Sequence, residues 1–323
     1  MGGLISRPTA SEPVPQKEST TAVDGPHSET TPANTEQTDA GAHDSSDPSR
    51  AIVENQATDV ESPLVPHEFR PLELAEISIV NHNSKTFRFK FPDPNSRLKQ
   101  HFACFYFVQA EIDGEVIQRP YTPISAIDEP GSVTLLVKIY DRPYGKMGNH
   151  IDSLKIGDTL KFKGPIPKIE YHPNAYDHIG MLSAGSGITP MYQVLREIWN
   201  KPNDKTRVTL LMSNSTIKDI LLRKELEAMK AERPDQLTLV FTVSRPEDLW
   251  DGESGRIDEQ KIRAWDILPS KETKTLVLVC GPPGFTASMA GPKLIIPGQR
   301  PQQGELEGCL KSIGFTKDEV FKF

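Results

Sequence analysis

The chain has little hydrophobic and aromatic residue content for its 323 residues, and the deficit is concentrated at one end. Hydrophobic residues make up 36% of the sequence, and 28 residues are proline. Residues 1–68 contain no Phe, Trp or Tyr and are rich in Ser, Thr, Pro, Asp and Glu. Such a stretch cannot bury enough apolar surface to offset the entropy of ordering it. We therefore expect residues 1–68 to be a disordered acidic tail.

Cysteine pairs, long apolar runs and basic blocks are also absent. Cys104, Cys280 and Cys309 form no Cys-x-x-Cys motif, which argues against a disulfide scaffold and a zinc site. No apolar run approaches the roughly 18 residues of a membrane-spanning helix, and we expect no secretory signal. The tail has three Lys or Arg against twelve Asp or Glu, a net charge of −9, and the remainder has 34 against 32, a net charge of +2. We therefore expect neither a nucleic-acid partner nor a metal site.

The first residues carry a lipidation signal. Met1-Gly2-Gly3-Leu4-Ile5-Ser6 fits the pattern Met-Gly-x-x-x-Ser, in which Gly2 becomes N-myristoylated. The alternative is that a glycine occupies the second position by chance. A single myristoyl chain binds a membrane only marginally, and no neighbouring cysteine or polybasic run supplies a second signal. The pattern predicts a reversible anchor on a long acidic tether.

Residues 69–174 show the period-two alternation of β-strands. Phe87, Phe89 and Phe91 alternate with Arg88 and Lys90, and Asp113-Gly114 has the composition of a hairpin turn. The strands we expect cover residues 74–80, 86–91, 102–110, 116–125, 132–140 and 159–164, the third of them buried on both faces. Short strands at this spacing indicate an antiparallel barrel or sandwich.

Residues 175–323 instead alternate strands with helices. Strands are expected at 178–183, 207–212, 237–243 and 275–280, and helices at 190–199, 217–232, 259–264 and near 306–313. This alternation is typical of an open parallel sheet with helical crossovers. The fold class predicted is therefore an antiparallel β-domain followed by an α/β domain.

The most informative stretch is Arg119-Pro120-Tyr121-Thr122-Pro123-Ile124-Ser125. The two prolines stiffen it into an extended segment. Tyr121 could then lay its ring on a planar ligand while Arg119 grips a phosphate with two hydrogen bonds. The alternative is an ordinary turn with a solvated arginine.

This stretch resembles the Arg-x-Tyr-Thr-x-x-Ser flavin signature of the ferredoxin-NADP reductase superfamily, and most of all its NADH–cytochrome b5 reductase branch. The resemblance implies a β-barrel domain that binds FAD, followed by an α/β domain that binds NADH. It implies that Tyr121 packs on the isoalloxazine, that Arg119 meets the pyrophosphate, and that Thr122 or Ser125 bonds near the flavin and ribitol. Pro120 belongs to the same cofactor-binding motif.

Two further motifs of the β-domain match this branch. Val137-Lys138-Ile139-Tyr140 resembles a segment whose backbone lies against the flavin and whose lysine lies near the NADH site, although an exposed lysine on an edge strand is the common alternative. Gly145-Lys146-Met147-Gly148 precedes a helix that we expect at 149–155, and its N–H groups could bind the FAD pyrophosphate. The branch has Ser or Thr where this chain has Gly148, which implies a weaker hold on FAD.

The α/β domain carries three matching motifs. In Ser183–Met191, Gly185 and Gly187 let a dinucleotide approach the backbone and Pro190 suits a first helical turn. By resemblance, Thr189 lies between flavin and nicotinamide. Asp219 begins a helix, and by resemblance its carboxylate accepts the ribose 2′-OH and repels a 2′-phosphate, which favours NADH over NADPH.

Cys280-Gly281-Pro282-Pro283-Gly284 follows the last central strand, where a ligand crevice lies. A free cysteine is usually a small buried hydrophobe. The resemblance instead implies that Cys280 lies beside the nicotinamide and shapes hydride transfer without acting as a nucleophile. The terminal Val-Phe-Lys-Phe323 is similar to that of fungal mitochondrial members, and the resemblance spans roughly residues 72–323.

The function predicted is an FAD-dependent oxidoreductase that takes hydride from NADH and passes single electrons to a haem protein. The leading candidate for this haem protein is cytochrome b5. Catalytic roles fall to Thr189, Cys280 and Lys138. One alternative is a related flavoprotein with another acceptor, such as quinone or haem in cytochrome c maturation. The other is a non-catalytic membrane-tethered scaffold. We expect a monomer on the cytoplasmic face of an intracellular membrane, with the mitochondrial outer membrane as one candidate.

Overall fold

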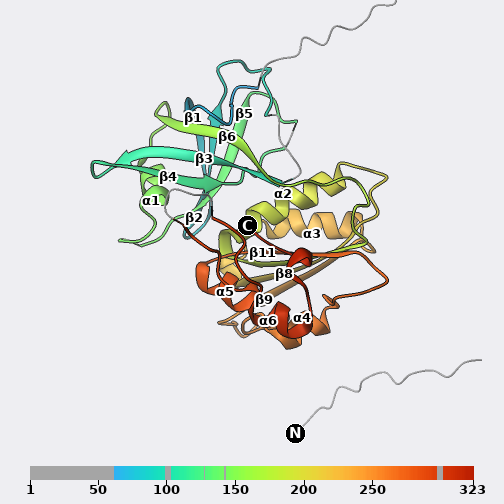
Figure 1. The fold of residues 1–323 in the computed structure, drawn as a ribbon. Helices are drawn as coiled ribbons and strands as arrows, with labels where there is room; N and C mark the ends of the chain where they lie inside the picture. Colours follow the sequence, from blue (N-terminus) through green and yellow to red (C-terminus); the bar gives the residue numbers. More distant parts are fainter. Residues whose placement is uncertain (1–61, 99–102, 127, 142, 297–300) are drawn as a thin grey trace, which may run out of the picture. The chain divides into compact units, whose positions relative to one another are not determined.

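The alternating residues of the first half form a six-stranded antiparallel sheet in the computed structural model, which describes residues 62–98, 103–126, 128–141, 143–296 and 301–323 (Figure 1). The strands are β1 (Arg70–Asn81), β2 (Ser84–Lys90), β3 (Ala103–Ile112), β4 (Glu115–Tyr121), β5 (Ser132–Lys138) and β6 (Thr159–Ile169). Their order in the sheet is β4-β3-β6-β1-β2-β5. The expected strands are confirmed. The Asp113-Gly114 hairpin is also confirmed, because both residues have positive φ and connect β3 to β4.

The core of this domain is built from the apolar face of each strand. Phe87 and Phe89 of β2 are completely buried, and Phe89 packs edge-on against Phe162 of β6 with ring centroids 5.0 Å apart. Burying each such ring contributes about 1.5–3 kcal/mol. The expectation that β3 is buried on both faces is wrong. Phe105 and Phe107 are half-exposed, because the face they occupy is covered mainly by lysine side chains rather than by a second layer.

The two edges of this sheet are joined just beyond β4. Ile124 N donates to Thr134 O of β5 over 2.9 Å, and Thr134 N donates to the Ser125 hydroxyl oxygen over 3.2 Å. The sheet therefore curls toward the closure that a barrel requires. Pro120 lies within β4, where an edge position tolerates its missing N–H.

The β-domain includes residues before Phe69, the residue at which the sequence analysis starts this domain. Leu64 is 1% exposed and belongs to the same core as Phe87. Val65 O accepts a hydrogen bond from Gly164 N over 3.1 Å. Residues 62–68 are thus part of the β-domain, and the rest of the proposed tail lies outside the described residues.

The second half forms a six-stranded parallel sheet in the order β10-β9-β8-β7-β11-β12. Its strands are β7 (His178–Ala184), β8 (Arg207–Asn214), β9 (Leu237–Val243), β10 (Glu253–Ser254), β11 (Thr275–Cys280) and β12 (Val320–Lys322). The helices are α2 (Ile188–Trp199), α3 (Arg223–Glu232), α4 (Glu259–Ala264), α5 (Pro283–Ala290) and α6 (Gly308–Ile313). The fold class read from the sequence is confirmed.

Helices cover both faces of the parallel sheet (Figure 1). Apolar residues of α2 and α3, such as Met191 and Leu226, pack with Leu210 in one core. Those of α4, α5 and α6, such as Ile262 and Met289, pack with the opposite face in another. This arrangement leaves the carboxyl ends of the strands as the exposed edge at which loops can gather.

Some elements differ from the expectation. The helix we expected over 217–232 is broken into a 3₁₀ turn (Ile217–Asp219) and α3, because Leu222 takes a left-handed φ of 55°. Ile220, Leu221 and Leu222 are all buried, and three successive buried side chains cannot lie on one face of a helix. The sequence analysis also missed α5, β10 and β12.

The β-domain and the α/β domain belong to one compact unit, residues 57–323, and hydrogen bonds connect them. Gln193 of α2 accepts the backbone N–H of Cys104 in β3 over 2.9 Å, and both residues are buried. Arg196, one turn further along α2, donates to Ile124 O over 2.6 Å. Helix α2 is therefore fastened directly to two segments of the β-domain.

Replacing Gln193 should test this fastening. In Gln193→Leu the Cys104 N–H loses its side-chain acceptor, and we expect the free energy of unfolding to fall by about 1–3 kcal/mol. The matched control is Gln118→Leu, because the Gln118 amide donates to Gln109 on an exposed surface. The control should change stability by about 0.5 kcal/mol at most. Urea denaturation measures both, and equal losses would contradict the role of Gln193.

Candidate cofactor and nicotinamide site

The predicted flavin motif lies at the end of the edge strand β4. Arg119 is exposed, and its guanidinium makes one hydrogen bond, from Nη1 to Gln118 O over 2.8 Å, which leaves donors available for an anion. The half-buried Tyr121 ring packs against the core of the β-domain, and burial raises the pKa of its phenol to about 12. Thr122 lies just beyond the end of this strand.

The glycine motif that follows begins a helix rather than preceding one. Helix α1 spans Lys146–Ser153, and Gly145 is its N-cap with φ 66°. The first i to i−4 bond runs from Asn149 N to Gly145 O, so the N–H groups of the three residues before Asn149 remain without helical partners. The helix start expected at Asn149 is therefore wrong, because Lys146, Met147 and Gly148 already form its first turn. Met147 is buried in the core, while Lys146 pairs with Glu115 at the surface over 3.3 Å.

The two glycines of this motif keep the N-terminus of α1 close to the segment after β5. A Cβ on Gly148 would lie 3.1 Å from Lys138 O, and one on Gly145 would lie 3.1 Å from the Tyr140 Cβ. A serine or threonine at position 148 would therefore press on the end of β5. With free N–H groups, the helix dipole and Arg119, the arrangement fits a diphosphate. This supports the predicted FAD cradle.

The end of β5 and the residues just after it lie next to this cradle. Val137 is buried in the core, and Ile139 N donates to Asn83 O over 2.7 Å. Tyr140 is 45% exposed and lies close enough to Tyr121 to influence the pKa of its phenol. Lys138 turns toward the α/β domain.

The glycine loop of the α/β domain lies at the carboxyl end of β7. Gly185–Gly187 form a 3₁₀ turn that leads into α2, and Gly185 has φ 55° with open space around it. A Cβ on Gly187 would lie 2.3 Å from Cys280 O, so this glycine is required by the neighbouring strand β11 rather than by a ligand. Thr189 is 8% exposed and donates to Ser186 O over 3.2 Å, and Pro190 is buried in the first turn of α2.

Cys280 ends β11 beside the glycine loop. Its strand pairs with β7, so that Cys280 lies opposite Ser183. Burial raises the pKa of the Cys280 thiol to about 12, although the Lys293 ammonium acts in the opposite direction. The thiol therefore stays neutral at physiological pH, which agrees with a packing role rather than a nucleophilic one. A Cβ on Gly281 would meet Phe285 and Ala184, and Pro282 and Pro283 begin α5 at the surface.

The sequence analysis assigns no site role to three residues near Cys280. Phe323, the last residue, donates its N–H to Val279 O over 2.9 Å. Lys322 is 3% exposed, and its Nζ donates to four carbonyl oxygens between Ala290 and Glu305 over 3.0–3.4 Å. Burial lowers the pKa of Lys293 to about 8, and the nearby Lys168 of β6 acts in the same direction. The signal available in the sequence was the Val-Phe-Lys-Phe terminus.

Asp219 connects the two domains. Its side chain is 7% exposed, and one carboxylate oxygen accepts Thr216 N over 3.1 Å and the Thr216 hydroxyl over 2.8 Å. The other oxygen accepts Lys138 Nζ and the Asn83 amide, each over 3.3 Å, and lies 3.6 Å from His82 Nε2. Close by, the Asn81 amide donates to Lys218 O over 2.9 Å. Lys138 and Asp219, which we expected at the nicotinamide and ribose, are thus paired with each other.

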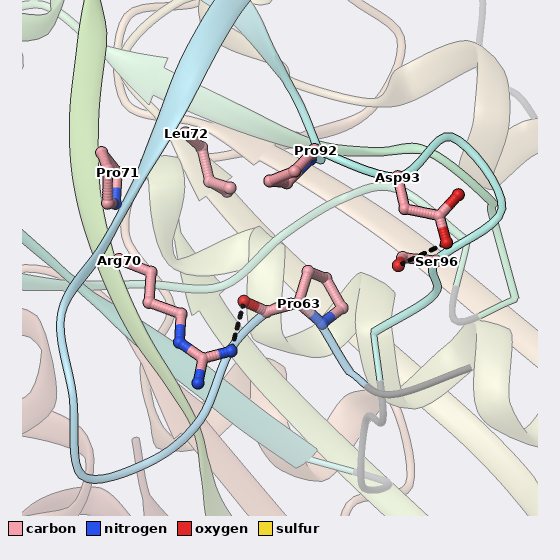
Figure 2. Close-up of a pocket in the computed structure, with 7 residues that line it drawn as sticks. All are labelled: Pro63, Arg70, Pro71, Leu72, Pro92, Asp93 and Ser96. Atoms are coloured by element: carbon pink, nitrogen blue, oxygen red, sulfur yellow. Dashed lines mark hydrogen bonds between the residues drawn. The ribbon is translucent and has the colours of Figure 1, made fainter. Parts of the chain in front are cut away.

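An apolar hollow lies in another part of the β-domain. It encloses about 320 Å³ between the start of β1 and the loop after β2. Figure 2 shows the Arg70 guanidinium turned to Pro63 O, and Asp93 bonded to Ser96. None of the predicted site residues lines it.

The Asp219 pairing predicts a pH dependence of stability. Burial acts to raise the pKa of this carboxyl, but bonds from Thr216 and Asn83 and the Lys138 ammonium together hold it below its ordinary value. A lowered carboxyl pKa contributes stability above the unfolded-state pKa, and the contribution is lost as the pH falls through the folded-state pKa. Asp219→Asn should therefore lower the free energy of unfolding by about 1–3 kcal/mol at pH 7, and the difference should shrink below about pH 4.

The control for this pH series is Asp235→Asn, because Asp235 is exposed after α3. Urea denaturation of both variants and the parent protein from pH 3 to 7 measures the effect. A loss for Asp219→Asn that stays constant with pH would contradict the charge-based explanation.

Comparison with known proteins agrees with this geometry. Residues 71–171 match the family described as oxidoreductase FAD-binding domain, and residues 181–290 match that described as oxidoreductase NAD-binding domain. The cytochrome b5 reductase domain of Ulva prolifera nitrate reductase is similar in structure, with a TM-score of 0.70 and 30% identity, and the match covers 81% of this chain and all of that one.

Curated relatives extend the likeness to most of the chain. NADH-cytochrome b5 reductase 2 of Coccidioides immitis is 41% identical over 255 residues, which cover 78% of this chain and 76% of the relative. NADH-cytochrome b5 reductase 2-A of Vanderwaltozyma polyspora is 42% identical over 253 residues, which cover 78% of this chain and 83% of the relative. On these matches and the shared geometry, the chain belongs to the NADH-cytochrome b5 reductase family.

Proposed function

We propose that this protein is an NADH-dependent FAD flavoprotein reductase that delivers electrons to cytochrome b5. One observation carries the proposal beyond family membership. The flavin motif is joined to the helix that follows the nicotinamide loop, because Ile124 O accepts a hydrogen bond from Arg196 of α2. Ile124 also packs into the core of the α/β domain. A flavin on the first motif and a nicotinamide on the second are thereby held in one geometry.

The residues proposed to hold FAD lie at one end of the β-domain. Arg119 and the free N–H groups of α1 would bind the pyrophosphate, and Tyr121 would pack its ring on the isoalloxazine. Thr122 and Ser125 would bond the flavin and ribitol. Backbone from Val137 to Tyr140, together with Pro120 and Gly145–Gly148, would complete the cradle. FAD bound there supplies the ability to take two electrons as hydride and to release them singly.

On the nicotinamide side, Gly185 and the N-terminus of α2 would take the NADH pyrophosphate, with Gly187 and Pro190 shaping the turn. Thr189 and Cys280 would bound the nicotinamide ring, together with Gly281–Pro283. The neutral Cys280 thiol excludes water without competing for hydride. Lys138 would hold the two domains in register through Asp219, and this role requires no proton transfer.

The surface proposed for the acceptor is the lysine strip of β6 that borders β3. Lys163 Nζ lies 4.4 Å from the Phe69 ring centroid, and Lys168 Nζ lies 4.7 Å from that of Phe105. Lys161 continues the strip. Aromatic rings hold these ammonium groups at the surface, where they would attract an acidic haem protein.

The membrane association also remains a proposal. Gly2 lies outside the described residues, and the helices of the described part include none long and apolar enough to cross a bilayer. We propose that myristate on Gly2 places a monomeric protein on the cytoplasmic face of an intracellular membrane, with the mitochondrial outer membrane as one candidate. The support is the Met-Gly-x-x-x-Ser pattern.

The spectrum of the purified protein should test the catalytic proposal. We expect flavin absorption that bleaches on anaerobic addition of NADH and returns when oxidised cytochrome b5 is added. The haem spectrum reports the transfer, and apoprotein reconstituted with FAD serves as the control for cofactor loss. A colourless protein that cannot be reconstituted would overturn the proposal in favour of the non-catalytic scaffold. A flavin that NADH bleaches but cytochrome b5 does not reoxidise would redirect the search to quinone or another haem acceptor.

The lipid proposal has its own test. In cells, Gly2→Ala should move the protein from membrane fractions to the supernatant, because one acyl chain supplies the attachment. Gly3→Ala is the matched control, since it leaves the modified residue intact. Unchanged fractionation of Gly2→Ala would reject the lipid anchor.

A further inference from the structure

The tail of this chain joins the β-domain beside the lysine strip of β6. Val65 O accepts a hydrogen bond from Gly164 N of β6 over 3.1 Å. Lys163, the neighbour of Gly164, has its Nζ 4.4 Å from the ring centroid of Phe69. The first described residue is Ser62, which comes shortly before both contacts. Residues 1–61 are therefore attached to the fold close to the middle of the strip.

Strand β6 carries positive charge only. Its charged residues are Lys161, Lys163 and Lys168, and it contains no Asp or Glu. The ion pairs among the described residues include neither Lys161 nor Lys163. The Lys163 ammonium instead lies near the rings of Phe69 and Phe107, 4.4 and 5.5 Å from their centroids. An ammonium on aromatic rings keeps N–H donors for a carboxylate.

The part of the tail nearest to the fold is acidic. Residues 47–61 contain four Asp or Glu against one Arg, a net charge of −3. The four acids are Asp47, Glu54, Asp59 and Glu61. A segment of this length reaches at most about 50 Å when extended, whereas the strand from Lys161 to Lys168 spans about 23 Å. Residues 47–61 are therefore long enough to lie along the whole strip.

Tethering favours this segment over other occupants of the strip. A group on a short linker reaches its site at an effective concentration in the millimolar range, and this concentration falls as the linker lengthens. A second copy of the chain, in a two-fold contact, would bring the lysines against each other, which like charges oppose. The segment next to the junction therefore has the advantage of both charge and proximity.

We propose that residues 47–61 lie on the lysine strip and that an acidic haem protein must displace them before it can dock. Exposed ion pairs are individually weak, so an acceptor can displace the segment. The competition rests on the proposed function, because it concerns the proposed acceptor surface. The contact between the tail and the strip is independent of that function.

Zero-length cross-linking of the full-length protein tests the contact without flavin or acceptor. A carbodiimide joins a carboxylate to an ammonium in direct contact, and mass spectrometry of the monomeric product locates the bonds. We expect bonds from residues 47–61 to Lys161 and Lys163 at least about tenfold more often than to Lys311, which is exposed on α6. Equal yields at Lys311, or bonds found only in cross-linked dimers, would overturn the contact.

Reduction of cytochrome b5 tests the competition. The full-length variant carries Asp47→Asn, Glu54→Gln, Asp59→Asn and Glu61→Gln. Its kcat/KM for cytochrome b5 at low ionic strength should be about 3- to 10-fold higher than that of the parent, because the competing carboxylates are gone. The gain should shrink as the ionic strength rises from about 0.01 to about 0.5 M.

The matched control neutralises the distant part of the tail. Residues 12–29 also contain four Asp or Glu against one base, Lys17, a net charge of −3. The control variant carries Glu12→Gln, Glu18→Gln, Asp24→Asn and Glu29→Gln. Both variants change the net charge of the chain by the same amount, so a general attraction of the acidic acceptor affects them alike. The control should gain less, because its acids have a longer linker to the strip.

The outcomes separate this inference from the proposed function. Flavin reduction by NADH should be the same in both variants and the parent, because the changes lie in the tail. Equal gains in kcat/KM for the two variants would overturn the competition while the proposed function stands. A parent protein that NADH reduces but that does not reduce cytochrome b5 would overturn the proposed acceptor and the competition together. The cross-links decide the contact in either case.

Discussion

The buried carboxylate of Asp219 is the interaction on which the arrangement of the two domains most depends. It lies in the α/β domain, yet half of its hydrogen bonds come from Lys138 and Asn83 of the β-domain. A buried charge is tolerated only when paired and fully hydrogen-bonded. Separating the domains would leave Asp219 and Lys138 without each other. The pair therefore favours one relative position of the flavin motif and the nicotinamide motif.

Close backbone packing complements this charge pair within the α/β domain. Gly187 approaches the Cys280 carbonyl so nearly that no side chain fits between them. The C-terminal residues stabilise the end of β11 beside Cys280. Lys322 donates to four carbonyl oxygens, and Phe323 N donates to Val279 O. An electron-transfer site of this kind needs orientation more than acid or base groups, since hydride transfer from NADH requires no protein proton. A neutral Cys280 beside glycine backbone meets that requirement.

Much of this protein follows from local sequence. Period-two alternation at Phe87 and Phe89 determines a strand with one buried face, and alternation of strands with helices determines a parallel sheet. The stiff Arg119–Ser125 segment and the glycines at 185 and 187 mark the two ligand motifs, because these conformations need particular residue types. The sequence analysis misplaced helix boundaries and breaks, such as the start of α1 at Lys146 and the interruption at Leu222 before α3. These boundaries and breaks depend on which side chains become buried in a hydrophobic core.

The tertiary structure alone decided how the functional side chains are partnered. Lys138 and Asp219 are 81 residues apart, and no local pattern indicates that each satisfies the other. Gly187 is a glycine because of Cys280, a residue from a strand far along the chain. The Asn214 amide, at the end of β8, is buried without a partner among the described residues, and no local pattern indicates this. Local sequence determines conformation through short-range sterics and periodicity, whereas partnership between distant side chains exists only once the domains have packed.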